Sequence, residues 1–229
     1  AVGLIAACAT AGIIIGVLNL TGTGLKFASG IIALSGGILP IALILTMGSS
    51  LILGMGLPTA AAYLICAAVI VPALTGLGVP ALTGHLFIFY FACLTAITPP
   101  VALAAFTAAS LGKTKPMGVA LTAVRLGIVA FIVPFIFAYN PQMLFENVTS
   151  VFQVIQIVIT ALLGIFAVAA GLEGYILRPM RWPLRVLAVI GGLTLLIPGT
   201  VSDLIGLVIV AGIIALQVMQ NKKAARETA

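Results

Sequence analysis

Charged residues are scarce in this sequence of 229 residues: Asp, Glu, Lys and Arg together make up 6% of it, against roughly 25% in an ordinary soluble domain. The long segment between Lys26 and Lys113 contains none of the four. A water-soluble globule needs a polar surface and a disordered chain is rich in charge, so the composition excludes both classes. The ten Lys and Arg residues are scattered and form no basic face, which argues against nucleic acid as a partner.

Cysteine and recognisable catalytic motifs are also few. The three cysteines, Cys8, Cys66 and Cys93, lie singly inside apolar runs, where a free thiol acts as a small hydrophobic group. The sequence has no HExxH motif, no nucleophile elbow and no pair of intramembrane aspartates. We therefore expect a protein that is not an enzyme and that has no cofactor.

The sequence is rich in long hydrophobic runs, and 63% of its residues are hydrophobic. The runs are continuous, whereas a membrane β-barrel strand alternates apolar and polar residues. The fold class that we expect is an all-α polytopic membrane protein.

Breaks in the apolar runs divide the chain into predicted parts. The opening run is long enough to span a membrane at about 20 residues and is followed by a glycine-rich break with a short interfacial helix. Near the C-terminus, Ser202 is a candidate N-cap for the last helix, with Asp203 favourable in its first turn. The parts are a spanning helix and interfacial segment (1–37), an interrupted apolar segment (38–74), a broken spanning helix (85–111), a spanning helix (117–138), three further spanning helices (151–220) and a basic cytoplasmic tail (221–229).

The segment 38–74 is interrupted near its middle by Gly54-Met55-Gly56-Leu57-Pro58-Thr59. Each of its two arms is short for a full membrane crossing at ~1.5 Å per residue. Two short arms around a Gly/Pro tip favour a re-entrant hairpin, which enters and leaves the membrane on the same side. The alternative is one kinked helix.

The helix 85–111 is interrupted at Thr95-Ala96-Ile97-Thr98-Pro99-Pro100. Two consecutive prolines remove two backbone donors and disfavour helical geometry at the residue before them. Unwound backbone at membrane depth is tolerated only where it is buried in protein or lines a wet cavity. The sequence therefore predicts a functional or tightly packed loop at this point.

Basic residues predict the orientation of the helices, since cytoplasmic loops carry an excess of Lys and Arg. The loops at 139–150 and 198–203 have neither and are expected outside, and the C-terminus is expected in the cytoplasm. The residues expected on the cytoplasmic side are Lys113, Lys115, Arg178, Arg181, Arg185, Lys222, Lys223 and Arg226.

Two interrupted helices in succession are typical of the binding site of a transporter. Free N–H groups at a break attract an anion such as a carboxylate, and free carbonyls together with hydroxyls coordinate a hard cation such as Na⁺. No carboxylate lies near these breaks, which disfavours a proton relay. The competing interpretation is that Gly and Pro only kink packed helices. The candidate cation ligands are Gly54, Gly56, Thr59, Thr95, Ile97 and Thr98, and the first break also supplies the hydroxyls of Ser49 and Ser50.

The two breaks also carry a family resemblance. The segment Gly54–Tyr63 (GMGLPTAAAY) resembles the hallmark of the large permease subunit of TRAP transporters, and more closely that of the fused-permease type that works with TAXI-type solute-binding proteins. The last three helices, with Gly171–Tyr175 and Pro198-Gly199, resemble the C-terminal extension of that type. The other segments similar to the family are His85–Phe91 (HLFIFYF), Ala96–Ala105 (AITPPVALAA), and Phe131–Phe135 through Tyr139–Pro141.

The resemblance implies a fold of two inverted repeats, each with a hairpin and a broken helix, that works as an elevator. Members are secondary transporters in the inner membrane of bacteria or archaea, usually Na⁺-coupled, that import organic acids delivered by a periplasmic solute-binding protein. The chain begins with Ala inside a helix-like run, and we expect it to be the second repeat of a longer permease whose N-terminal part would be its partner. Membrane lipid is the other expected partner. The residues that the resemblance implies for substrate binding are Pro58, Thr59, Thr98, Pro99 and Pro100.

Three alternatives stay open at this point. An H⁺-coupled carrier of the same family would need His85 or a carboxylate elsewhere, although a capping or interfacial role is the favoured interpretation of His85. Arg125 either extends toward the cytoplasmic face or pairs with substrate. The third alternative is a passive channel or a non-transporting membrane scaffold. Trp182, beside Arg181 and Arg185, is interpreted as an interfacial anchor.

Overall fold

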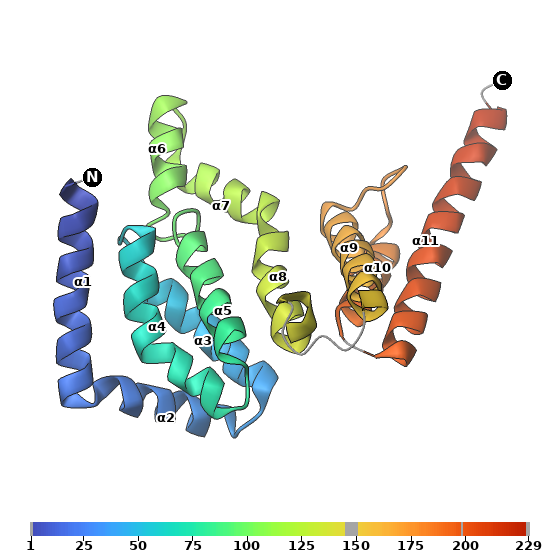
Figure 1. Ribbon diagram of the computed structural model, residues 1–229. Helices are drawn as coiled ribbons and strands as arrows, with labels where there is room; N and C mark the ends of the chain where they lie inside the picture. Colours follow the sequence, from blue (N-terminus) through green and yellow to red (C-terminus); the bar gives the residue numbers. More distant parts are fainter. Residues whose placement is uncertain (1, 145–150, 198, 228–229) are drawn as a thin grey trace. The chain divides into compact units, whose positions relative to one another are not determined.

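A computed structural model describes residues 2–144, 151–197 and 199–227, and its secondary structure is helical (Figure 1). The chain divides into two units, Ala1–Ala138 and Tyr139–Ala229. Within the described ranges three helices are long and apolar enough to cross a membrane, or five if each of two bent helix pairs is one span. The all-α polytopic fold expected from the composition is therefore confirmed.

The first unit begins with a helix pair that bends by 73° at a single glycine. Gly22, between the two helices, has a φ of 65°, a left-handed conformation that glycine adopts without strain. The bend lies inside the glycine-rich segment for which the sequence predicts a break. The helices of this unit are α1 (Val2–Thr21), α2 (Thr23–Ser35), α3 (Leu39–Leu53), α4 (Thr59–Gly76), α5 (Ala81–Leu94), α6 (Leu103–Leu111), α7 (Pro116–Leu126) and α8 (Ile128–Tyr139).

Helix α4 is the centre of this unit and packs against α1, α2, α3 and α5. Small residues allow the close contacts: a Cβ on Gly24 of α2 would lie 3.3 Å from the carbonyl oxygen of Ala68 on α4. On the α1 side, Ala11 packs with Ala61 and Ile65. The core is therefore built around a helix that the interruption at Gly54–Pro58 precedes.

Aromatic rings join α5 to α8. Phe87 and Phe91, both fully buried, lie 5.4 and 6.1 Å from the ring of Phe135. Edge-to-face aromatic pairs of this kind add to the free energy gained by burial. This contact fixes the first half of the broken helix, α5, against the unit's last helix.

The spanning helix predicted over 117–138 is bent in the structure, because α7 and α8 meet at an angle of 41°. At the bend, the N–H of Gly127 still donates to Ala123, four residues back, but the N–H of Ala130 donates to Gly127, only three residues back. The hydrogen-bond ladder tightens at this turn, which is an established cause of a helix kink.

The second unit contains a short 3₁₀ helix, η1 (Pro141–Leu144), and three long helices, α9 (Val151–Glu173), α10 (Trp182–Leu196) and α11 (Thr200–Glu227). One sequence prediction is corrected here. Helix α11 begins at Thr200, and the Ser202 hydroxyl donates to the carbonyls of Ile197 and Gly199, whereas an N-cap accepts from N–H groups ahead of it. Helix α11 continues as far as Glu227 in the basic segment 221–229, and the cytoplasmic position of that segment stays a prediction.

Glycines set how closely α9, α10 and α11 approach. A Cβ on Gly164 of α9 would lie 2.8 Å from the carbonyl oxygen of Gly192, and one on Gly192 of α10 would lie 2.6 Å from that of Gly164. Gly191 and Gly206 form the equivalent close approach between α10 and α11. Small residues at helix contacts are the usual means of packing inside membranes, where apolar burial between helices gives no advantage over lipid.

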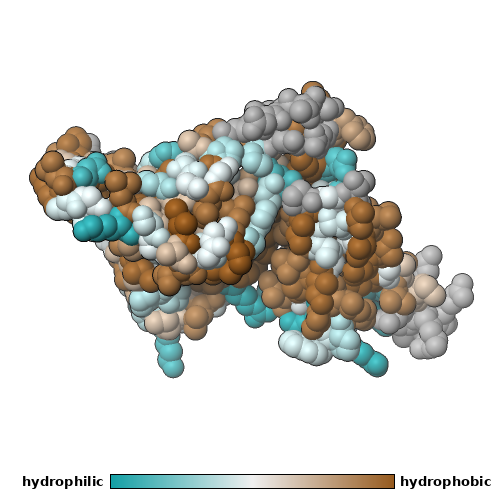
Figure 2. Space-filling model, turned by 90° about the horizontal axis from the view of Figure 1, so that it is seen from below, coloured by the Kyte–Doolittle hydropathy of each residue, from teal (hydrophilic) through white to brown (hydrophobic). Residues whose placement is uncertain are grey.

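The outer surface is largely apolar. Figure 2 shows hydrophobic residues over much of the visible face outside the grey atoms. Exposed apolar side chains occur on helices of both units, among them Ile13, Leu126 and Leu162. Exposed apolar surface on this scale suits contact with lipid or with another protein.

We expect Gly192→Ala to lower the melting temperature, because the new methyl would meet the backbone of Gly164 and force α9 and α10 apart. Overpacking of this kind costs about 1–3 kcal/mol. Gly212→Ala on α11 is the matched control: it meets nothing within 4 Å, and alanine favours a helix over glycine. Thermal unfolding of the detergent-purified variants checks this, and equal melting temperatures for the two would contradict it.

Candidate functional site

The first interruption folds back on itself. The Cys66 thiol on α4 donates to the carbonyl of Ser50 on α3 at 3.7 Å. In one continuous helix these residues, sixteen apart, would be separated by ~24 Å along the axis. Helices α3 and α4 are therefore neighbours in a helical hairpin, and the turn uses Gly56, whose φ is 77°. The single kinked helix is excluded.

The second interruption, between α5 and α6, is a loop of tight turns. Thr95 donates its hydroxyl to Ala92 at 2.7 Å and Thr98 donates its hydroxyl to Leu94 at 2.6 Å, both on α5. The N–H of Ala104, near the start of α6, donates to the carbonyl of Ala96 at 2.9 Å. The loop is thus held by hydrogen bonds at both of its ends.

The hairpin tip lies against this loop. A Cβ built on Gly54 would lie only 2.8 Å from Cγ2 of Thr95, and one built on Gly56 would lie 3.9 Å from Cγ1 of Val101. The φ of Gly54 is −83°, which any residue adopts. Glycine is therefore required at position 54 for space, because a methyl group there would occupy the volume of the Thr95 side chain.

The candidate cation ligands fall into two groups. Gly54 and Thr95 are buried and in contact across the interface, and Ile97 and Thr98 are half-buried in the same loop. Gly56 and Thr59 are exposed. The Thr95 and Thr98 hydroxyls donate their hydrogens to carbonyls of α5, so the lone pairs of each hydroxyl oxygen stay available to a cation.

The candidate substrate residues are more exposed. Pro58 stands directly before α4 and Thr59 is its first residue, and both are exposed, as is Pro100. Thr98 and Pro99 are half-buried. No hydrogen bond among the described residues joins the Pro58–Thr59 pair to the Thr98–Pro100 segment.

The start of α4 offers free backbone donors. The first N–H that is paired along this helix belongs to Ala62, which donates to Pro58 at 2.9 Å. The N–H groups of the three residues before it have no acceptor within the helix. At α6, by contrast, the loop carbonyl of Ala96 already takes one of the N-terminal N–H groups. An anion would therefore find more donors at α4 than at α6.

Two further residues belong to the site: Ser50, whose hydroxyl the sequence places at the first break, and Gly127, which the sequence does not single out. Ser50 is 0% exposed, and within the described part of the chain its hydroxyl oxygen has no hydrogen-bond partner. It lies one turn before Gly54, whose N–H donates to the Ser50 carbonyl. Gly127, at the α7–α8 bend, approaches Ile97: a Cβ there would lie 3.1 Å from Ile97 Cδ1. Sequence reasoning missed Gly127, and its one available signal was a lone glycine inside an apolar run.

Two other singled-out residues lie elsewhere. His85 is in the second turn of α5, where its Nδ1 pairs with the Tyr63 hydroxyl at 3.0 Å, so it does not cap this helix, and the alternative interfacial role stays a prediction. Arg125 is an exposed residue in the last turn of α7. Over the described ranges no group of three or more His, Cys, Asp or Glu side chains could hold a metal ion.

Comparison with known proteins supplies the family. Residues 1–154, more than half of the chain, match the family described as the tripartite ATP-independent periplasmic transporter, DctM component. Neither the curated proteins nor the solved structures include a match.

The matched range contains both interruptions, so the resemblance of GMGLPTAAAY and AITPPVALAA to TRAP permeases is confirmed. The family is a transporter permease and not an enzyme, and it works with a periplasmic binding protein and a small membrane subunit. The chain belongs to the DctM family, the large permease component of TRAP secondary transporters.

Proposed function

We propose that this chain forms the second half of the transport site of a Na⁺-coupled importer of organic acids. The observation that carries the proposal is the contact between the hairpin tip and the interrupted helix, with Gly54 against Thr95. Two broken helices meeting at their breaks are the arrangement in which transporters place their ion and substrate sites.

The cation would be held by neutral oxygens. The hydroxyl oxygens of Thr95 and Thr98 have lone pairs to offer, and the buried Ser50 hydroxyl has no partner among the described residues. The carbonyls of Gly54 and Thr95 accept only long hydrogen bonds, at 3.3 and 3.4 Å, which leaves their oxygens available. A set of hydroxyl and carbonyl oxygens without carboxylates favours an alkali cation over a proton.

The substrate carboxylate would bind at the start of α4. The free N–H groups there and the positive end of the helix dipole attract an anion. Thr59 adds a hydroxyl at the same point, and Pro58 keeps the chain extended just before it. Thr98, Pro99 and Pro100 would form the facing wall.

The close packing of the tip on the loop also supports an elevator movement. A contact that leaves no space for one methyl group makes the two interruptions move together. The site would then be carried as a unit, which an elevator requires, with the hairpin re-entrant and opening to the outside.

The remaining parts of the proposal concern partners and membrane. The chain would work with the N-terminal half of the same permease and with a TAXI-type periplasmic binding protein, in the inner membrane, with its C-terminus in the cytoplasm. The three helices α9, α10 and α11, which lie almost wholly beyond the matched residues, would be the extension of the fused-permease type.

We expect Na⁺ to raise the melting temperature of the full-length permease, since a ligand of the native state alone stabilises by about 2.7 kcal/mol at a hundred times its Kd. Thr98→Val and Thr59→Val should each weaken this shift. The matched control is Thr107→Val, because Thr107 also donates its hydroxyl four residues back, to Leu103, but lies inside α6.

The Na⁺ experiment separates the coupling ions. A K⁺ series at equal ionic strength measures the shift that salt alone produces. Equal shifts with Na⁺ and K⁺, together with uptake driven by a pH gradient in the absence of Na⁺, would overturn Na⁺ coupling and favour the H⁺-coupled alternative.

Gly54→Ala should reduce uptake at least about tenfold, because the added methyl would push the tip away from Thr95. Displacing a binding group by about 1 Å can lower a rate by as much as about 100-fold. Gly48→Ala, on the same helix with nothing within 4 Å, should keep normal uptake. The assay is binding-protein-dependent uptake into proteoliposomes of the full-length permease. Wild-type uptake by a folded Gly54→Ala variant would refute the role of this contact.

A further inference from the structure

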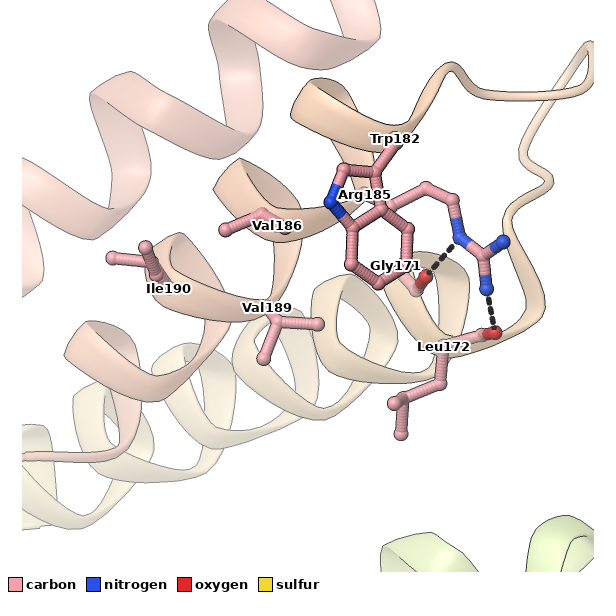
Figure 3. Close-up of a pocket in the computed structure, with 7 residues that line it drawn as sticks. All are labelled: Gly171, Leu172, Trp182, Arg185, Val186, Val189 and Ile190. Carbon is pink, nitrogen blue, oxygen red and sulfur yellow. Dashed lines mark hydrogen bonds between the residues drawn. The ribbon is translucent and has the colours of Figure 1, made fainter.

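The second unit has a groove that the transport proposal does not use. It lies where the end of α9 meets the start of α10, and its volume is about 190 Å³ (Figure 3). Its walls are apolar apart from the guanidinium of Arg185. The lining residues are Gly171, Leu172, Trp182, Arg185, Val186, Val189 and Ile190.

The groove is open on its outer side. Trp182 is 72% exposed, and Leu172 and Ile190 are exposed as well. Gly171 forms the floor, where a Cβ would lie 2.7 Å from Cγ2 of Val189, so α10 lies directly on α9 there. Helix α9 is long and apolar enough to cross a membrane, so an apolar groove on its exposed side suits lipid chains.

Arg185 is fixed at the mouth of this groove. Its Nε donates to the Gly171 carbonyl at 3.0 Å and its Nη2 donates to the Leu172 carbonyl at 2.6 Å. These carbonyls belong to the last turn of α9, where helix carbonyls lack partners. The guanidinium also lies 5.7 Å from the Trp182 ring. Held in this way, Arg185 still has the donors of Nη1 for an acceptor at the groove.

Positive charge collects at this end of the unit. Arg178 and Arg181 lie in the segment between α9 and α10, beside Arg185. The N–H of Arg178 donates to Oε1 of Gln217 on α11 at 3.0 Å, which brings the last part of α11 to the same end. Helix α11 continues from there to Glu227, and Glu173 at the end of α9 is acidic.

We propose that this groove binds an acidic phospholipid of the surrounding bilayer. The phosphate would accept hydrogen bonds from Arg185 and attract Arg181, and an acyl chain would lie along Val186, Val189 and Ile190. Trp182 would lie at the headgroup level, where tryptophan is enriched. Basic residues beside a membrane-spanning helix attract anionic lipid in the same way.

The choice of a lipid over a soluble anion follows from the walls. A soluble phosphate compound would gain nothing from the apolar groove, and its binding would rest on the arginines alone. A phospholipid suits both the charged and the apolar part of the groove, because its headgroup contacts the guanidinium and its acyl chain covers the exposed apolar surface.

The test is native mass spectrometry of the detergent-purified protein, titrated with phosphatidylglycerol or with phosphatidylcholine of the same acyl chains. The attraction between one basic residue and an anionic lipid corresponds to about a fivefold difference in affinity. We therefore expect phosphatidylglycerol to bind at least about fivefold more tightly than phosphatidylcholine. Val186→Trp should fill the groove and remove this preference. Val186 is 40% exposed, so the larger side chain does not disturb the core. Ile190→Trp is a second groove-filling variant.

Leu162→Trp is the matched control, because Leu162 is 63% exposed on α9 and does not line the groove. It should leave the preference for phosphatidylglycerol unchanged. Equal affinities for the two lipids in the unaltered protein would overturn the proposal. So would an equal loss of phosphatidylglycerol binding in the groove variants and in Leu162→Trp, since that result would show a general effect of surface bulk. The readout is independent of transport, so it stands whether or not the Na⁺ proposal holds.

Discussion

Every backbone N–H and C=O group in a chain this apolar needs a hydrogen-bond partner. The structure depends on the interruptions, where the helix no longer supplies those partners. Regular helices satisfy the backbone internally, so they can face lipid with apolar side chains. Each interruption creates free polar groups, which must be buried against protein or used. The tip at Gly54–Pro58 and the loop at Thr95–Ala102 each pack on the other, which buries their backbone groups against protein. The loop carbonyls also accept hydrogen bonds, from N–H groups in its own turns and from the start of α6.

Glycine has two different purposes in the two units. At Gly164 and Gly192 it allows two helix backbones to touch, which is a scaffold contact between continuous helices. At Gly54 it allows the end of a helix to touch a loop. The missing side chain there brings together backbone groups of the tip and of the loop that are not fully hydrogen-bonded. The backbone angle at Gly54 is ordinary, which shows that the requirement comes from the neighbouring Thr95. Close packing in this chain therefore builds a rigid scaffold in one place and a candidate site in the other.

The parts of the fold that depend on local sequence were predictable, and those that depend on distant contacts were not. Two prolines after Thr98 and the Gly-x-Gly-x-Pro pattern at Gly54 locate both interruptions, because proline and glycine act on their own backbone. The bend at Gly127 was missed, since a lone glycine in an apolar run is compatible with a straight helix until hydrogen bonds change register. Ser202 has the residue type of an N-cap, but its hydroxyl turns back to the carbonyls of Ile197 and Gly199. The Gly54–Thr95 contact joins two separate helices, and no local pattern indicates it.

The two breaks differ in which of their backbone groups stay free, and this difference bears on how they would share a substrate and a cation. At the α4 end the N–H groups are unpaired, so the break is positive and suits an anion. At the α5–α6 loop the Ala96 carbonyl has taken an N–H of α6, while the Thr95 and Thr98 hydroxyls have given their hydrogens to α5. What remains at the loop is oxygen lone pairs, which suit a cation. A cation bound there would neutralise much of the negative potential facing a carboxylate at Thr59, so binding of each ion would favour binding of the other. Coupling between the two would then follow from charge at one packed interface, without a titrating side chain.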